Sequence, residues 1–174
     1  SHTGAIAGAY EIYRAAFKKA GIIELGGYED FLVACKAFGL TSGAAGKRVM
    51  IITDGGGMGV SIADECAAAG LFVPALPEEV ADELKETFPP YFTAGNPFDL
   101  TGSATDESFA LALSKTMSGD FYDMVIVAAL WGPPALTDNL PGMLAQKPGF
   151  TEKPIIVCTP GGSYSRERIR LFHE

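Results

Sequence analysis

The chain has 174 residues, of which 48% are hydrophobic, and its formal net charge is -8. This length and composition allow one globular domain with a substantial core and a small additional piece. The negative charge argues against a surface for nucleic acid or anionic membranes, and no apolar run approaches the roughly 20 residues of a membrane span. We expect a cytoplasmic protein without a metal site, because its three cysteines show neither zinc nor redox-pair spacing. These are Cys35, Cys66 and Cys158.

The amino-terminal part of the chain predicts two helices followed by a linker. Apolar residues at helical spacing indicate helices over Gly4–Ala20 and Glu29–Phe38, with a short strand over Ile22–Leu25 between them. The segment Leu40–Gly46 is rich in Gly, Ser and Ala, which is typical of a linker. We therefore predict a boundary between residues 1–43 and 44–174. Both ends of the sequence look cut, and we expect a fragment of a longer chain.

After the linker, segments that predict strands alternate with segments that predict helices. The predicted strands are Arg48–Thr53, Leu71–Ala75, 96–100, Met124–Leu130 and Pro154–Cys158. The predicted helices are Gly57–Ala69, Pro77–Phe88, Thr105–Met117 with Thr105 as its N-cap, Asp138–Ala145 and a final one after Gly162. Continuous apolar strands, such as Met124–Leu130, are typical of a sheet buried on both faces. The sequence predicts an α/β fold with a doubly wound, mostly parallel sheet.

Three turns that follow predicted strands contain glycine or proline, and ligands bind at such turns in open parallel sheets. They are Asp54–Gly59, Trp131–Pro134 and Thr159–Gly162. The first turn leads into a helix N-terminus, which favours anions, but it matches neither the dinucleotide fingerprint nor a P-loop. The alternative, that these glycines only permit tight turns and close packing, stays open.

Single residues in this pattern also have two interpretations. The imidazole of His2 could carry a phosphoryl group, or His2 could be an unstructured terminal residue. Asp54 and Asp99 could be catalytic carboxylates, although an Asp at a strand end more often caps the next turn. Trp131 could stack on a flat ligand or pack half-buried. The three arginines of the last helix could form a basic face or a solvated surface: Arg166, Arg168 and Arg170.

Several blocks, in order, resemble the NDP-forming acyl-CoA synthetases, a family that includes ADP-forming acetyl-CoA synthetase and is related to succinyl-CoA synthetase. The segment 1–8 with Ala20-Gly21-Ile22 resembles the phosphohistidine segment of the family. The later blocks resemble its flavodoxin-like ligase domain. They are 52–60, 68–71, 96–102 and 133–138.

The resemblance implies an acid–thiol ligase in which acyl-CoA and phosphate give an acyl phosphate that phosphorylates a histidine. The phosphohistidine then passes its phosphoryl group to ADP on an ATP-grasp domain. His2 matches that histidine. The substrate and phosphate contacts match one turn, Asp54, Gly55, Gly56 and Gly57, and a second turn that feeds a helix N-terminus, Gly132, Pro133 and Pro134. The resemblance also implies CoA, ADP or ATP, Mg²⁺, a small acyl substrate, CoA-binding and ATP-grasp partners, and an oligomeric enzyme.

The chain departs from the family pattern in two ways. The family often carries Asn where this chain has Asp54, and a carboxylate there would repel a phosphoryl group. Three possibilities follow: the pKa of Asp54 is raised, its side chain faces away, or catalysis is altered. The CoA-binding and ATP-grasp domains do not appear in the sequence. Two alternatives stay open: a non-catalytic sensing or scaffold module, as in chains fused to protein acetyltransferases, and a flavodoxin-type electron carrier.

Overall fold

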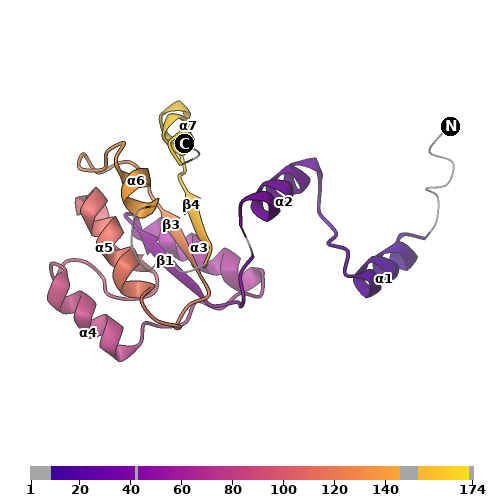
Figure 1. The fold of residues 1–174 in the computed structure, drawn as a ribbon, viewed down its shortest axis with the longest axis horizontal. Helices are drawn as coiled ribbons and strands as arrows, with labels where there is room; N and C mark the ends of the chain where they lie inside the picture. The colour runs from indigo at the N-terminus through magenta and orange to yellow at the C-terminus, as the bar shows by residue number, and fades with distance from the viewer. Residues whose placement is uncertain (1–8, 42, 146–152, 173–174) are drawn as a thin grey trace. The chain divides into compact units, whose positions relative to one another are not determined.

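A computed structural model describes residues 9–41, 43–145 and 153–172. The chain divides into two units, Ser1–Thr41 and Ser42–Glu174. This division falls inside the segment that the sequence predicts as a linker. Figure 1 labels the helices and strands of both units.

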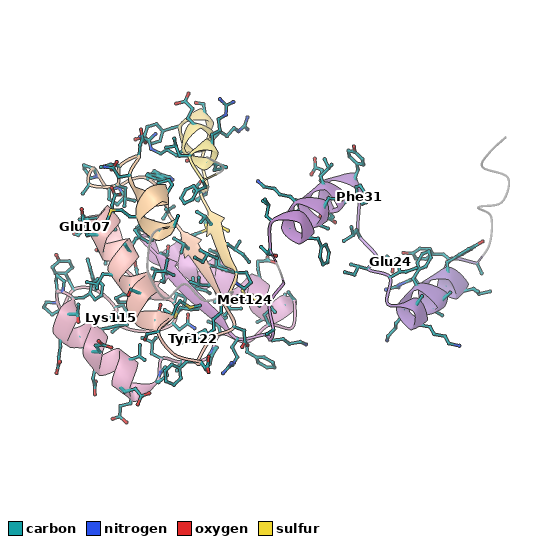
Figure 2. The ribbon with its side chains drawn as sticks, in the orientation of Figure 1. Glu24, Phe31, Glu107, Lys115, Tyr122 and Met124 are labelled. Carbon is teal, nitrogen blue, oxygen red and sulfur yellow. The ribbon has the colours of Figure 1, made fainter. Side chains whose placement is uncertain are left out.

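The first unit contains two helices and little else. Helix α1 (Tyr10–Ala20) ends at Gly21, whose φ of 69° is the left-handed conformation typical of a glycine after a helix. Helix α2 (Tyr28–Leu40) follows. The predicted strand over Ile22–Leu25 is wrong: the segment has no regular secondary structure and pairs with no described strand. Neither helix buries a residue within the unit, and side chains such as Phe31 project from α2 (Figure 2).

The second unit is built on a four-stranded parallel sheet. Its strands are β1 (Val49–Thr53), β2 (Phe98–Asp99), β3 (Met124–Ala128) and β4 (Ile155–Cys158). The strand order is β2-β1-β3-β4, and β1 pairs with β3 along its whole length. The predicted parallel α/β sheet is therefore confirmed. The chain leaves β1 toward one edge of the sheet, and then returns to build β3 and β4 on the other side.

Helices cover both faces of this sheet, because successive strand residues point to opposite sides. Val49 and Ile51 pack with Cys66 of α3 (Gly56–Ala68) on one face. Met50 and Ile52 face the larger core on the other side. Three helices pack into that core, α4 (Glu78–Thr87), α5 (Asp106–Thr116) and α6 (Leu140–Ala145) (Figure 1). The short 3₁₀ helix η1 (Thr101–Ser103) and α7 (Ser163–Arg170) complete the unit.

The predicted start of α5 is confirmed in detail. Thr105 Oγ1 accepts a hydrogen bond from the Ser108 backbone N–H at 3.1 Å. In return, Ser108 Oγ accepts one from the Thr105 backbone N–H at 2.8 Å. This reciprocal pair forms a capping box.

The predicted strand over Leu71–Ala75 is wrong, because a side chain occupies much of the edge of β1 that it would need. Phe72 makes a single bridge with Arg48. Beyond it, Asn96 Oδ1 accepts from the Ile51 backbone N–H at 3.0 Å. Asn96 Nδ2 donates to the carbonyls of Val49 and Pro74, both at 2.8 Å. One amide side chain therefore provides β1 with hydrogen bonds that a neighbouring strand would otherwise make.

The last strand is also less buried than its apolar sequence predicts. All five residues of β3 are buried, whereas none of the four residues of β4 is. Ile156 is 43% exposed. The reason is position, since β4 is the terminal strand in the described sheet order.

Arg48 and Asp123 link the beginnings of β1 and β3. The Asp123 carboxylate accepts hydrogen bonds from Arg48 Nε at 3.0 Å, Nη2 at 2.7 Å and the backbone N–H at 2.8 Å. These bonds lower the pKa of Asp123 to about 2. Because a lowered pKa favours the folded state, the stabilisation is complete above the ordinary value of 3.8 and is lost as the pH falls toward 2.

We expect Asp123→Asn to lower the free energy of unfolding at pH 7 by about 1 to 2 kcal/mol. The difference from the parent should narrow as the pH falls from 3.8 toward 2, because the unfolded chain binds the proton first and folded Asp123 becomes neutral only near pH 2. Urea unfolding of the parent and the variant at pH 7 and pH 2.5 measures the difference in the free energy of unfolding at each pH. The matched control is Asp82→Asn, since its pair with Lys85 is more than half exposed on both sides and contributes little. An equal loss at both pH values would contradict this interpretation.

Candidate functional site

The topology of the sheet brings two of the predicted turns together. The chain order reverses between β1 and β3, and the crevice beyond the carboxyl ends of two such strands is the usual ligand site of an open parallel sheet. Asp54 follows β1, and Leu130 lies in the segment after β3. Asp54 Oδ1 accepts a hydrogen bond from the Leu130 backbone N–H at 2.9 Å. The two turns are therefore joined directly at the switch point.

The carboxyl group of Asp54 is enclosed. Asp54 is only 6% exposed, and its Oδ2 atom is buried without a hydrogen-bond partner. Burial raises the pKa of Asp54, and the negative charge of Asp99 raises it further. Of the possibilities that the sequence leaves open for this carboxyl, the structure supports a raised pKa.

The glycine turn begins α3 without a side-chain cap. Gly55 is the N-cap residue, and its own N–H donates to Thr53 Oγ1 at 3.0 Å. The backbone N–H groups of Gly56 and Gly57 belong to the first helical turn, where amides lack an intrahelical acceptor. These two amides, rather than that of Gly55, are the donors that the turn can offer to an anion.

Two side chains approach the glycines of this turn closely. A Cβ on Gly55 would lie within 3.0 Å of Leu130 Cδ1, and a Cβ on Gly56 would lie 2.7 Å from Asp99 Oδ2. Asp99 is itself held by its neighbour, since its Oδ1 accepts from the Thr101 backbone N–H at 2.8 Å. Asp99 therefore lies beside the start of α3, where a negative charge is favourable. Close packing is therefore present at Gly55 and Gly56, and so is the helix N-terminus.

The second turn is different from the one that the sequence predicts. Pro133 and Pro134 have no N–H to donate, so among the three predicted contact residues only Gly132 offers a backbone donor. The helix that follows, α6, begins only at Leu140. The helix predicted over Asp138–Ala145 is therefore present, with a start two residues later than predicted. The intervening chain is held instead by Asp106, which accepts from the Thr137 N–H at 2.9 Å and from its hydroxyl at 2.5 Å.

Trp131 and Arg168 form an arrangement that the sequence does not reveal. Trp131 has a φ of 57°, is 5% exposed and has a buried Nε1 without a partner. The Arg168 guanidinium carbon lies 5.2 Å from the Trp131 ring centroid and 3.7 Å from that of Tyr164, and Arg168 pairs with Asp138 at 3.3 Å. Trp131 is more buried than the half-buried packing role predicts. Of the three arginines, Arg168 packs inward while Arg166 and Arg170 are exposed.

The third turn places one more polar group at this edge. Thr159 follows β4, and its hydroxyl is buried without a hydrogen-bond partner. Gly161 has a φ of 130°, and α7 begins two residues later. The sequence pattern does not show that the Thr159 hydroxyl is buried or that the Leu130 amide bonds to Asp54. Both depend on how the strands pair in the sheet. The two histidines, His2 and His173, lie outside the described residues.

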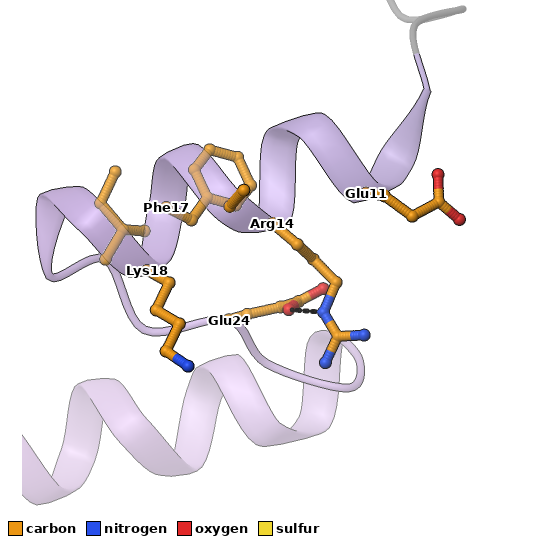
Figure 3. Close-up of a pocket in the computed structure, with 7 residues that line it drawn as sticks. Glu11, Arg14, Phe17, Lys18 and Glu24 are labelled. Atoms are coloured by element: carbon orange, nitrogen blue, oxygen red, sulfur yellow. Dashed lines mark hydrogen bonds and ion pairs between the residues drawn. The ribbon is translucent and has the colours of Figure 1, made fainter.

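A pocket of about 490 Å³ lies on the first unit, and none of the predicted contact residues lines it (Figure 3). Arg14 Nε donates to Glu24 Oε2 at 3.0 Å across it. Its lining residues all come from α1 and the segment that follows: Glu11, Arg14, Ala15, Phe17, Lys18, Ile22 and Glu24. Within the part of the chain that the structure describes, no group of three or more His, Cys, Asp or Glu could hold a metal ion.

Residues 49–139, which include both turns of the switch point, match the Ligase-CoA domain family. The chain belongs to this family. The match extends from the start of β1 to the residue before α6. It covers more than half of the sequence.

Curated relatives extend the similarity over nearly the whole chain. The chain is 31% identical over 178 residues to the alpha subunit of ADP-forming acetate–CoA ligase II of Pyrococcus furiosus, covering 100% of this chain and 39% of that protein. It is 32% identical over 172 residues to ADP-forming acetate–CoA ligase I of Archaeoglobus fulgidus, covering 99% and 24%. The Ligase-CoA chain therefore spans at most about two fifths of the length of these relatives.

A solved structure agrees in fold. The dinucleotide-forming acetyl-coenzyme A synthetase 1 of Ca. Korarchaeum cryptofilum, in complex with phosphate and ADP, matches with a TM-score of 0.88 at 29% identity. The match covers 99% of this chain and 38% of that one. The Ligase-CoA assignment and the parallel α/β fold are thus supported by independent comparisons of sequence and structure.

Proposed function

We propose that this chain is part of an NDP-forming acyl-CoA synthetase that works through a phosphohistidine. Acyl-CoA and phosphate give acyl phosphate and free CoA, and the acyl phosphate transfers its phosphoryl group to His2 with release of the acid. ADP then takes the phosphoryl group and becomes ATP, and the whole sequence is reversible. The observation that carries this proposal is the similarity of the entire chain to ADP-forming acetate–CoA ligases.

In this scheme the switch point holds the phosphoryl group while it is transferred. The N–H groups of Gly56 and Gly57 at the start of α3, with the amide of Gly132, supply fixed donors and the positive end of a helix. Asp54 and Gly55 shape the turn, and Pro133 and Pro134 fix the path of the second one. These contacts need no rearrangement of backbone dipoles during the reaction, which is how such sites stabilise developing charge.

The chain needs further parts to complete a turnover. We assign residues 1–43 to the end of a histidine-bearing domain and residues 44–174 to the flavodoxin-like ligase domain. CoA-binding and ATP-grasp domains, on the same chain or as separate subunits, would bind CoA and ADP or ATP with Mg²⁺ and would receive the small acyl substrate. The Pyrococcus furiosus relative is named as an alpha subunit, which supports an assembly of subunits. No helix in the described residues is long and apolar enough to cross a membrane, and we propose a cytoplasmic location.

Phosphorylation of the complete enzyme tests the proposal. After incubation with ATP and Mg²⁺, intact mass spectrometry should detect one added phosphoryl group that maps to His2 and is lost in acid. Adding ADP should remove the group and return ATP. An enzyme that turns over acyl-CoA without any such adduct would exclude the phosphohistidine route, and one that binds CoA without turnover would favour the sensing module.

A further inference from the structure

We infer that Asp54 is a positioning residue that works as the neutral acid, joining the glycine turn to the segment after β3 so that both face an anionic group. This inference rests on the proposed function, because it concerns the same switch point. It accounts for an aspartate at a position where a negative charge would oppose the phosphoryl group.

The first argument is the hydrogen bonding of the Asp54 carboxyl. Oδ1 accepts from the Leu130 N–H at 2.9 Å, whereas Oδ2 is buried and has no partner. A carboxylate would leave negative charge on an unpartnered oxygen in a residue only 6% exposed. A buried charge without a partner costs far more free energy than a neutral hydroxyl without one. A proton on Oδ2 removes that cost and leaves the bond to Leu130 intact.

The second argument is the surrounding charge. Asp99 extends from β2, and its Oδ2 lies beside Gly56 at the start of α3. From the segment after β3, the neutral Leu130 amide donates to Asp54, and the first residues of α3 are the uncharged Gly56 and Gly57. The negative charge of Asp99 and the burial of Asp54 both raise the pKa of Asp54. With Asp54 neutral, a bound anion faces one carboxylate instead of two.

This arrangement couples the binding of an anion to the binding of a proton. A negative ligand beside Asp54 opposes its ionisation, so the ligand raises the pKa of Asp54. By linkage, ionisation of Asp54 weakens the binding of the ligand to the same extent. We expect sulfate to bind on the order of ten times more tightly to the protonated form, at the lower end of the range usual for coupled sites. Sulfate is the appropriate probe because its charge stays constant between pH 4 and pH 9.

The test uses the 174-residue chain and two variants. In Asp54→Asn, the amide oxygen still accepts from Leu130 and no charge is possible, so sulfate affinity should be independent of pH. In Asp54→Ala, affinity should also be independent of pH but weaker, because the bond that joins the two turns is lost. In the parent, affinity should fall as the pH rises through the transition of Asp54. Nuclear magnetic resonance reports affinity from the Gly56 and Gly57 amide shifts, and the titration of Asp54 from its carboxyl carbon shift.

The outcomes separate this inference from the proposed function. If sulfate shifts the Gly56 and Gly57 amides with the same pH profile in the parent and in Asp54→Asn, the inference is overturned while the anion site stands. A carboxyl of Asp54 that titrates at or below its ordinary value overturns the inference as well. If sulfate shifts neither amide in any of the three proteins, the anion site fails, and the inference fails with it.

Discussion

Replacing His2 with alanine should abolish the acid-labile phosphoryl adduct and lower the acyl-CoA-dependent formation of ATP by roughly 10³-fold or more, as loss of a covalent carrier usually does. The measurement is turnover of the complete enzyme together with its intact mass after incubation with ATP. The fold should be unaffected, so thermal unfolding of the variant should match that of the parent.

The chain supplies its own control for this variant. Its sequence contains two histidines, and the second is His173. His173→Ala should keep both the adduct and the turnover. Normal turnover in His2→Ala, or an adduct that moves to another residue without loss of activity, would exclude His2 as the phosphoryl carrier.

A change at Asn96 should have the largest effect on stability. Its amide makes three hydrogen bonds to the backbone, to Ile51, Val49 and Pro74, along the edge of β1. We expect Asn96→Ala to lower the free energy of unfolding by about 2 to 4 kcal/mol, because buried backbone groups of β1 lose their partners. Chemical denaturation of the chain, followed by circular dichroism, measures this loss.

Asn96→Asp keeps the shape of the side chain and tests the same network by charge. An ionised carboxylate at this position would face the carbonyls of Val49 and Pro74, to which Asn96 now donates. The loss in the free energy of unfolding at pH 7 should therefore exceed that of the alanine variant. Such a carboxyl should have a raised pKa in the folded protein. The loss of stability relative to the parent should therefore become smaller as the pH falls, because the protonated acid can donate a hydrogen bond again. If the aspartate variant is as stable as the parent at pH 7, the structural role of Asn96 is wrong.

The candidate site could be predicted only in part from the sequence. The position of Asp54 and the glycines after an apolar strand predicts a turn at the ligand edge, and the structure confirms that place. The partner of Asp54 could not be predicted, since the Leu130 N–H is a backbone group 76 residues away. The partner of Thr137 could not be predicted for a similar reason: its N–H donates to Asp106, which is 31 residues away in the chain.

The sequence by itself determined the alternation of strands and helices, the parallel class of the sheet, the cap of α5 and the family resemblance. These depend on periodicity, on local hydrogen bonding and on the order of short blocks, all of which are local along the chain. Only the tertiary structure decided that Asn96 takes over much of one edge of β1, that β4 is left half-exposed, and that the buried carboxyl group of Asp54 joins two turns. Each of these depends on which backbone groups meet across the sheet, and strand order sets that after the local elements have formed.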